Sequence, residues 1–242
     1  MNAGGVIAIA AREVGATWKT PTGWVISALY TLLTASVFTL TTLAPGQPAS
    51  LRYYFAPAAS LLLLVAPALS MRLFSEEFRT GTAEPLRAAP VSDGQVVTGK
   101  LLGALACLVL MVAPTLAFPL TLFALGDPAP DPGPMAAGLL GLLLVGLVYV
   151  SLGGFVSSLT DSQTLAFLGA LLTLLAIEAI AGLLPDRVPA PWDRIAASVS
   201  VRGRLGEFSR GVIDAGVTIV LLTTSAWLGV LTWISLSLRR SR

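Results

Sequence analysis

The sequence is dominated by six apolar segments, each about twenty residues long or longer. A helix of ~20 residues spans the ~30 Å hydrocarbon core of a bilayer. Only 12% of the 242 residues are charged, whereas soluble chains carry about 25%. We therefore expect an all-α polytopic membrane protein, because lipid offers an open backbone no hydrogen-bond partner. Six transmembrane helices are expected at about residues 23–44, 54–73, 101–125, 135–157, 164–184 and 212–238, within a single domain covering residues 1–242.

The residue types that are rare narrow the function further. The chain has no histidine and one cysteine, Cys107, which argues against disulfide frameworks, zinc sites and histidine-based catalysis. Its net charge of +2 lacks the basic excess of a nucleic-acid-binding protein. We therefore predict no catalytic residue, no metal or cofactor bound by this chain, and no nucleic acid partner.

One motif has the spacing of a nucleotide site but lacks its other requirements. Gly94–Lys100 fits the pattern G-x-x-x-x-G-K of a phosphate-binding loop. Such a loop also needs Ser or Thr after the lysine and a strand before it, whereas here Leu101 follows. We predict instead a helix opened by a capping box at Ser92–Gln95, with Lys100 at the membrane surface and no ATP hydrolysis by this chain.

Residues 1–20 are expected to form a helix that lies in the membrane interface. Its apolar side chains fall on one side of a helix and its basic ones on another, namely Ile7, Ala11, Val14 and Trp18 against Arg12 and Lys19. A frayed N-terminal tail is the alternative. Thr20 followed by Pro21 is typical of a helix start, and Thr160–Gln163 matches a second capping box.

Basic residues indicate the orientation, because cytoplasmic loops carry more of them. With both termini in the cytoplasm, nine of the fifteen Lys and Arg residues lie inside and six outside. Five of the outside residues belong to the loop 185–211 and oppose this bias, whereas the loop 126–134 has no basic residue and suits the outside. We therefore expect both termini in the cytoplasm.

Residues 71–100 carry four basic and four acidic side chains, a much higher density than the rest of the chain. Gly81 and Thr82 are expected to break the helix that leaves the second span. Glu84–Ala88 is long enough for a short helix before Pro90. A short helix between two breaks suits the groove of a partner protein. On charge alone, an ordinary solvated loop is an equally good interpretation.

The same segment resembles the signature of a known family. The run Met71-Arg-Leu-Phe-Ser-Glu-Glu-x-Arg-Thr-Gly-Thr-x-Glu-x-Leu-x-x-x-Pro-Val-Ser, with Gly99-Lys100, is similar to that of ABC-2 type permeases, particularly the gliding-motility-associated subfamily. Further pieces follow in the same order along the chain: Pro21-x-Gly23, Pro67, Ser157–Gln163 and Ser209–Asp214. The resemblance covers nearly the whole chain and implies an ABC-2, type V exporter-like permease fold.

In such permeases the loop between the second and third spans carries a coupling helix that seats in a cleft of a separate ABC ATPase. The resemblance therefore implies a cytoplasmic coupling segment at residues 74–100, with these contact residues: Glu76, Glu77, Arg79, Gly81, Thr82, Glu84, Leu86, Arg87 and Pro90. It also implies MgATP on the ATPase, and a second permease copy or a related membrane subunit with an extracytoplasmic domain. The implied location is the bacterial cytoplasmic membrane.

The loop 185–211 corresponds to the family's short helix or re-entrant element between the last two spans. Its residues 192–199 space apolar side chains along one helical face, which would rest in the outer leaflet among membrane lipids. Such a helix could serve as an outer gate or a docking surface; the alternative is a loop that rests on the membrane. Arg210 and Asp214 are four residues apart, which predicts a structural ion pair at the start of the last span.

Glu178 is the one acid well inside a span. Burying an unpaired acid in a bilayer costs at least a few kcal/mol, so we expect this side chain to face a partner, water or a subunit interface. A group that lines a transport path and a structural hydrogen bond are both consistent with its position.

Together these features predict the permease subunit of an ABC exporter, driven by a separate ATPase. The alternative is an ATP-independent membrane transporter or a membrane scaffold subunit. A secondary transporter would be expected to show more polar residues near the midplane and internal inverted repeats, which the sequence does not show clearly.

Overall fold

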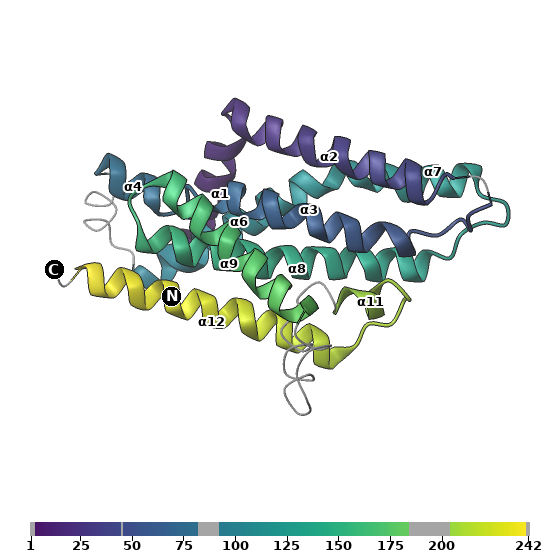
Figure 1. The fold of residues 1–242 in the computed structure, drawn as a ribbon. Coiled ribbons are helices and arrows are strands. Elements are labelled where there is room, and N and C mark those ends of the chain that lie inside the picture. Colours follow the sequence, from purple (N-terminus) through teal and green to yellow (C-terminus); the bar gives the residue numbers. More distant parts are fainter. Residues whose placement is uncertain (1–2, 45, 82–91, 184–203, 241–242) are drawn as a thin grey trace, which may run out of the picture.

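The computed structural model describes residues 3–44, 46–81, 92–183 and 204–240. Within these residues every regular element is a helix, and the helices form one elongated bundle (Figure 1). They are, in chain order, α1 (Ala3–Trp18), α2 (Pro21–Thr41), α3 (Arg52–Ser70), α4 (Ser75–Thr80), α6 (Asp93–Val112), the 3-10 helix η1 (Ala113–Leu116), α7 (Ala117–Leu125), α8 (Pro132–Leu159), α9 (Gln163–Leu183), α11 (Leu205–Phe208) and α12 (Ala215–Arg240).

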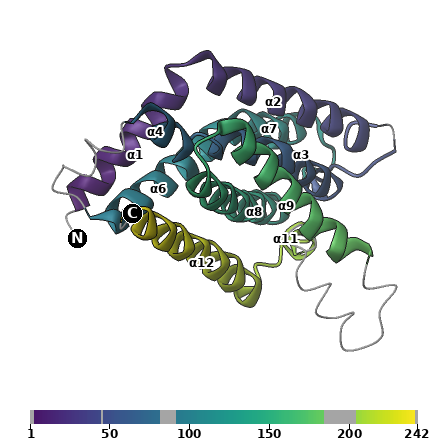
Figure 2. The same cartoon turned by 60° about the vertical axis from the view of Figure 1, so that its left-hand side comes forward.

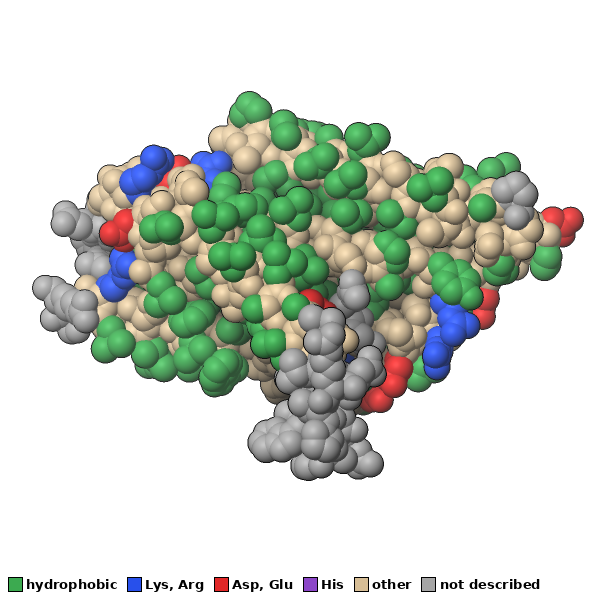
Figure 3. Space-filling model, viewed as in Figure 1, with side chains coloured by type: hydrophobic (Ala, Val, Ile, Leu, Met, Phe, Trp, Pro, Cys, Tyr) green, Lys and Arg blue, Asp and Glu red, His purple; other side chains and the backbone are tan. Residues whose placement is uncertain are grey.

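Six of these helical stretches are long and apolar enough to cross a membrane. They are Pro21–Thr41, Arg52–Thr80, Asp93–Leu125, Pro132–Leu159, Gln163–Gly182 and Ala215–Arg239. Each overlaps one of the six predicted spans, so the all-α polytopic fold is confirmed. Large apolar side chains cover the outside of the bundle, as Figure 3 shows over the middle of one face. Leu165, Leu172 and Trp227, for example, are each more than half exposed, as lipid-facing residues are.

The two ends of the bundle differ. The chain ends, α1, α4 and the turn between α8 and α9 lie together at one end (Figures 1 and 2), which we call the charged end. The α2–α3 loop and the α7–α8 connection lie at the other, which we call the far end. Both termini lie at one end, as an even number of spans requires.

Helix α8 is the centre of the bundle and contacts α3, α6, α9, α11 and α12. Its glycines face large side chains of its neighbours: a Cβ at Gly138 would overlap the ring of Phe55, and one at Gly141 would overlap Leu205 and Phe208. Small residues therefore let these helices pack closely, as is common in membrane proteins.

Several local predictions hold. Ser92 Oγ accepts a hydrogen bond from the Gln95 backbone N–H at 3.3 Å, while the Gln95 side chain accepts one from the Ser92 N–H at 2.9 Å, which completes the capping box. Thr20 is the N-cap of α2 and Pro21 its first residue. The third span is not one continuous α-helix, because the 3-10 helix η1, which contains Pro114, separates α6 from α7.

The second capping box is wrong by two residues. Helix α9 begins at Gln163, and the hydroxyl that accepts from its first turn belongs to Ser162, whose Oγ is 3.4 Å from the Leu165 backbone N. Thr160 instead accepts a hydrogen bond from the Ser162 N–H. The next residue, Asp161, is thereby left to pair with Arg239.

The predicted ion pair between Arg210 and Asp214 is also wrong, because the two residues do not share a helix. Helix α12 begins only at Ala215, and Gly211 turns the chain before it with a φ of +86°. Asp214 Oδ1 accepts hydrogen bonds from the backbone of Gly216 at 2.6 Å and of Val217 at 3.3 Å, so its carboxylate caps α12 instead. The predicted helix at 192–199 lies outside the described residues.

Candidate functional site

The short helix α4 stands at the charged end and is held at its start by another span. Ser157, which is fully buried in α8, accepts hydrogen bonds from the backbone N–H groups of Phe74 and Ser75, both at 3.1 Å. Its hydroxyl also donates to the Met71 carbonyl at 2.9 Å. The first N–H groups of a helix have no partner within it. Ser157 of α8 therefore supplies the hydrogen-bond acceptor that the start of α4 lacks.

Gly81 ends α4 with a left-handed φ of +70°, which glycine adopts without steric cost. The predicted helix break is thus confirmed at Gly81. Thr82, Glu84, Leu86, Arg87 and Pro90 lie outside the described residues, and so does the short helix predicted there.

Four charged side chains from three helices meet beside α4. We call this group, Arg12 and Glu13 of α1, Glu77 of α4 and Lys100 of α6, the charged junction. Lys100 Nζ lies 2.9 Å from Glu13 Oε1 and 3.0 Å from Glu77 Oε1. It also donates to the Leu73 carbonyl, so all three N–H groups of the ammonium have acceptors.

Burial makes this arrangement energetically important. The Lys100 side chain is 1% exposed, while Glu13 and Glu77 are 17% and 16% exposed. Arg12, which is half exposed, contacts both carboxylates, at 2.6 Å from Glu77 and 3.3 Å from Glu13. A buried charge is tolerated only when it is paired and hydrogen-bonded, so Lys100 ties the positions of α1, α4 and α6 to one another.

Two glycines on α6 let α1 approach closely enough for this contact. A Cβ at Gly99 would meet Ile9 at 2.8 Å and the Val6 carbonyl at 3.0 Å, and one at Gly103 would meet Glu13 Cβ at 2.7 Å. The spacing of these glycines is the small-x-x-x-small pattern of tightly packed membrane helices. Helix α1 is thus a packed part of the bundle on its Ile9 side, while Ile7 is 67% exposed. Its place in the membrane interface stays a prediction.

The sequence reasoning misplaced Lys100 and overlooked Glu13 and Ser157. Lys100 was expected at the membrane surface, but it is buried beneath α1 because Glu13 and Glu77 neutralise it there. The signal that could have revealed this contact is the Gly99-x-x-x-Gly103 pattern, which marks the face of α6 where another helix approaches. No comparable pattern in the sequence points to Ser157 as a cap for a helix eighty residues away.

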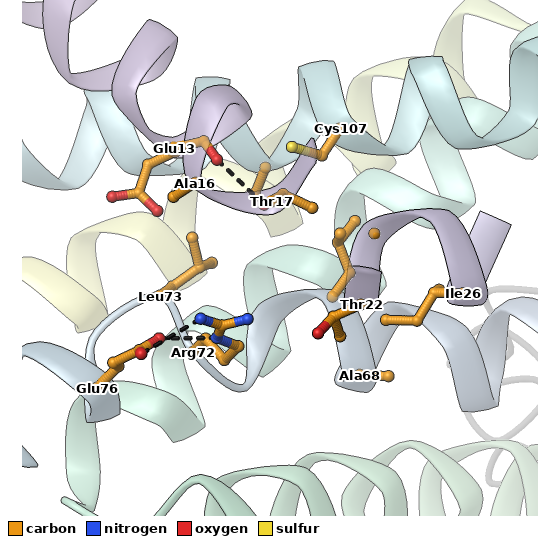
Figure 4. A pocket seen from close by; sticks show the side chains of 13 residues that line it. Glu13, Ala16, Thr17, Thr22, Ile26, Ala68, Arg72, Leu73, Glu76 and Cys107 are labelled. Carbon is orange, nitrogen blue, oxygen red and sulfur yellow. Dashed lines mark hydrogen bonds and ion pairs between the residues drawn. The ribbon is translucent and has the colours of Figure 1, made fainter. Parts of the chain in front are cut away.

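A small cavity lies next to the charged junction. It lies between α1, α2, α3, α4 and α6 and has a volume of about 50 Å³. Figure 4 shows Glu13 and Thr17 on one wall and the Arg72–Glu76 ion pair, with Nε 2.7 Å from Oε2, on the opposite one. A cavity of this size holds a few water molecules and is smaller than a typical ligand pocket of about 300 Å³ or more.

The remaining predicted residues take separate positions. Of the predicted coupling residues on α4, Glu77 belongs to the charged junction, Glu76 pairs with Arg72, and Arg79 is exposed. Glu178 lies on α9 and accepts a hydrogen bond from the fully buried Tyr149 hydroxyl at 3.0 Å. The carboxyl therefore faces a polar partner, as its position within a span requires. Its role in transport stays a prediction.

These features define a multi-pass helical membrane protein in which a short, partly exposed helix rests on a buried ion network at one end of the spans. A family model described as ABC-2 family transporter protein matches residues 24–198, which is most of the chain. The chain therefore belongs to the ABC-2 family of transporter proteins and is a permease component of an ABC transporter. A comparison with curated proteins finds no match.

Proposed function

We propose that this chain is the permease subunit of an ABC exporter and that a separate ATPase, which binds and hydrolyses MgATP, docks at the charged end. The docking surface is α4 together with the following residues 82–91. The charged end then faces the cytoplasm, with both termini on that side. A second permease copy, or a related membrane subunit with an extracytoplasmic domain, completes the transporter, and the substrate crosses between the two.

The observation that supports this proposal best is the sharing of Lys100 by Glu13 and Glu77. A force on the exposed end of α4 moves Glu77, and because the same ammonium binds Glu13, α1 and α6 must follow or the buried pair must break. Ser157 adds a second connection, from α4 to the central helix α8. An ordinary solvated loop at this position would need neither connection.

Site-directed crosslinking tests where the ATPase docks. The only native cysteine, Cys107, is buried, so one introduced cysteine is the accessible thiol. A benzophenone maleimide on Arg79→Cys, an exposed position of α4, should capture a Walker-motif ATPase from the native membrane. Arg52→Cys, exposed at the far end, is the matched control and should capture none.

The same two variants test the orientation. In intact cells a membrane-impermeant maleimide should label Arg52→Cys and leave Arg79→Cys unlabelled until the membrane is opened. Capture of an ATPase at Arg52 would contradict docking at the charged end. Capture of none at either position, together with unchanged transport after Glu84 and Arg87 are replaced, would favour an ATP-independent transporter or scaffold.

A further inference from the structure

An apolar groove runs between α8 and α12 where both helices reach the charged end. It has a volume of about 410 Å³ and opens to the outside of the bundle. Its walls include Phe155 and Leu159 of α8 and Leu231, Ile234 and Leu238 of α12, and Arg239 stands at its end. Leu159, Ile234 and Leu238 are 53%, 41% and 61% exposed. In a membrane these side chains face lipid, so the natural occupant of the groove is an acyl chain.

One positive and one negative side chain, those of Arg239 and Asp161, lie side by side where this groove reaches the charged end of the bundle. Arg239 Nη1 lies 2.6 Å from Asp161 Oδ1, and Nη2 donates to the Leu159 carbonyl at 2.7 Å. A guanidinium has five N–H groups, and within the described residues these two bonds use only two of them. Asp161 is 65% exposed, and its second carboxylate oxygen accepts no hydrogen bond from the residues that the structure describes.

Both groups lie where spanning helices end, which is where lipid headgroups are expected. Arg239 is in the last turn of α12, and Asp161 is in the short turn between α8 and α9. Arginine binds phosphate through several parallel N–H groups, while a carboxylate accepts hydrogen bonds from an ammonium. The pair therefore matches a headgroup that carries a phosphate and a primary amine.

We propose that this groove is a binding site for a zwitterionic, primary-amine phospholipid such as phosphatidylethanolamine. One acyl chain lies along the apolar walls, the phosphate binds Arg239, and the ammonium binds Asp161. Phosphatidylcholine fits less well, because its quaternary ammonium has no N–H to donate. Phosphatidylglycerol fits least well, because it offers Asp161 no positive charge.

The site is also connected to the docking helix. The Arg239 guanidinium lies over the ring of Phe78 of α4, 4.5 Å from its centroid, which is a cation–π geometry. A headgroup bound to Arg239 therefore also stabilises the contact between Arg239 and Phe78 of α4. The lipid site itself follows from the groove and the charge pair and does not depend on an ATPase partner.

Native mass spectrometry of the purified chain, exchanged into an equimolar mixture of dioleoyl phosphatidylethanolamine, phosphatidylcholine and phosphatidylglycerol, tests this site. The wild-type protein should retain phosphatidylethanolamine above the other two. Asp161→Asn should lower its retention about tenfold, to the level of phosphatidylcholine, since one charge-assisted hydrogen bond is lost. Arg239→Gln should lower retention of all three lipids.

Ile234→Trp keeps both charges and fills the groove, so it should lower retention of all three lipids even if the charge variants fold poorly. Arg52→Gln, at the far end, is the control and should retain lipid as the wild type does. Retention of phosphatidylglycerol equal to or above that of phosphatidylethanolamine would overturn the proposal. So would a phosphatidylethanolamine preference that survives Asp161→Asn, or binding that Ile234→Trp leaves unchanged.

Discussion

Replacing Lys100 with methionine removes the positive charge shared by Glu13 and Glu77 while keeping a side chain of similar length. Removing one partner of a buried ion pair costs about 3–5 kcal/mol, because the remaining charge is left uncompensated. Here the two carboxylates are 17% and 16% exposed, and Arg12 still contacts both. We therefore expect Lys100→Met to lower the free energy of unfolding by about 3 kcal/mol, the lower end of that range.

The measurement is reversible unfolding by sodium dodecyl sulfate in mixed micelles, followed by circular dichroism. Arg79→Met is the matched control: it also removes one positive charge from the charged end, but from an exposed position. Such surface changes stay within about 0.5 kcal/mol. The difference in the free energy of unfolding between the two variants separates the effect of burial and pairing from the effect of losing one positive charge.

A double-mutant cycle then tests whether Lys100 acts through Glu77. Glu77→Gln alone leaves Lys100 with Glu13 and the Leu73 carbonyl. In the double variant Lys100→Met with Glu77→Gln, one of the two stranded carboxylates is gone, so the loss should be smaller than the sum of the single losses by about 1–3 kcal/mol. Additivity within about 0.5 kcal/mol would refute the charged junction as a connection between α4 and α6.

Two further predictions use neighbouring residues as their own controls. Ser157→Ala should destabilise the protein by about 2 kcal/mol, because two backbone N–H groups at the start of α4 lose their acceptor. Ser158 is equally buried, but among the described residues its hydroxyl bonds only to the Phe155 carbonyl of its own helix, so Ser158→Ala should cost less than about 1 kcal/mol. Equal losses in the same unfolding assay would contradict the capping role. Gly153→Ala should cost about 1–3 kcal/mol by overpacking, because the added Cβ overlaps the Ser70 hydroxyl. At Gly154 the nearest atom to an added Cβ is a flexible leucine methyl at 3.3 Å. Thermal unfolding should therefore show a smaller loss of stability for Gly154→Ala than for Gly153→Ala.

The spans were predictable because they follow from length and hydropathy, and both are local properties. The capping box at Ser92 was predictable for the same reason, since its two partners are three residues apart. Gly81 ends α4 as expected, because a left-handed backbone conformation is a local property that glycine adopts readily.

The contacts of the site were not predictable, because they join residues that are far apart in the chain. Lys100 is separated from Glu13 by 87 residues. The Gly99-x-x-x-Gly103 pattern marks the face of α6 that another helix approaches, but it does not show which helix or which acidic residue meets Lys100 there. Arg210 and Asp214 show the opposite failure. Their spacing suggested an ion pair, but spacing is informative only if a helix is continuous, and α12 begins after Asp214.

The length of α4 has a consequence for assembly. It has only six residues, and isolated helices shorter than about 12–15 residues are marginal in water. Its helical form therefore depends on Ser157 from α8 and on the ion pair with Lys100 from α6, and it should be lost in a separated peptide. If the ATPase recognises helical α4 as proposed, it binds only a chain whose spans have already come together, and its binding then depends on correct folding of the permease.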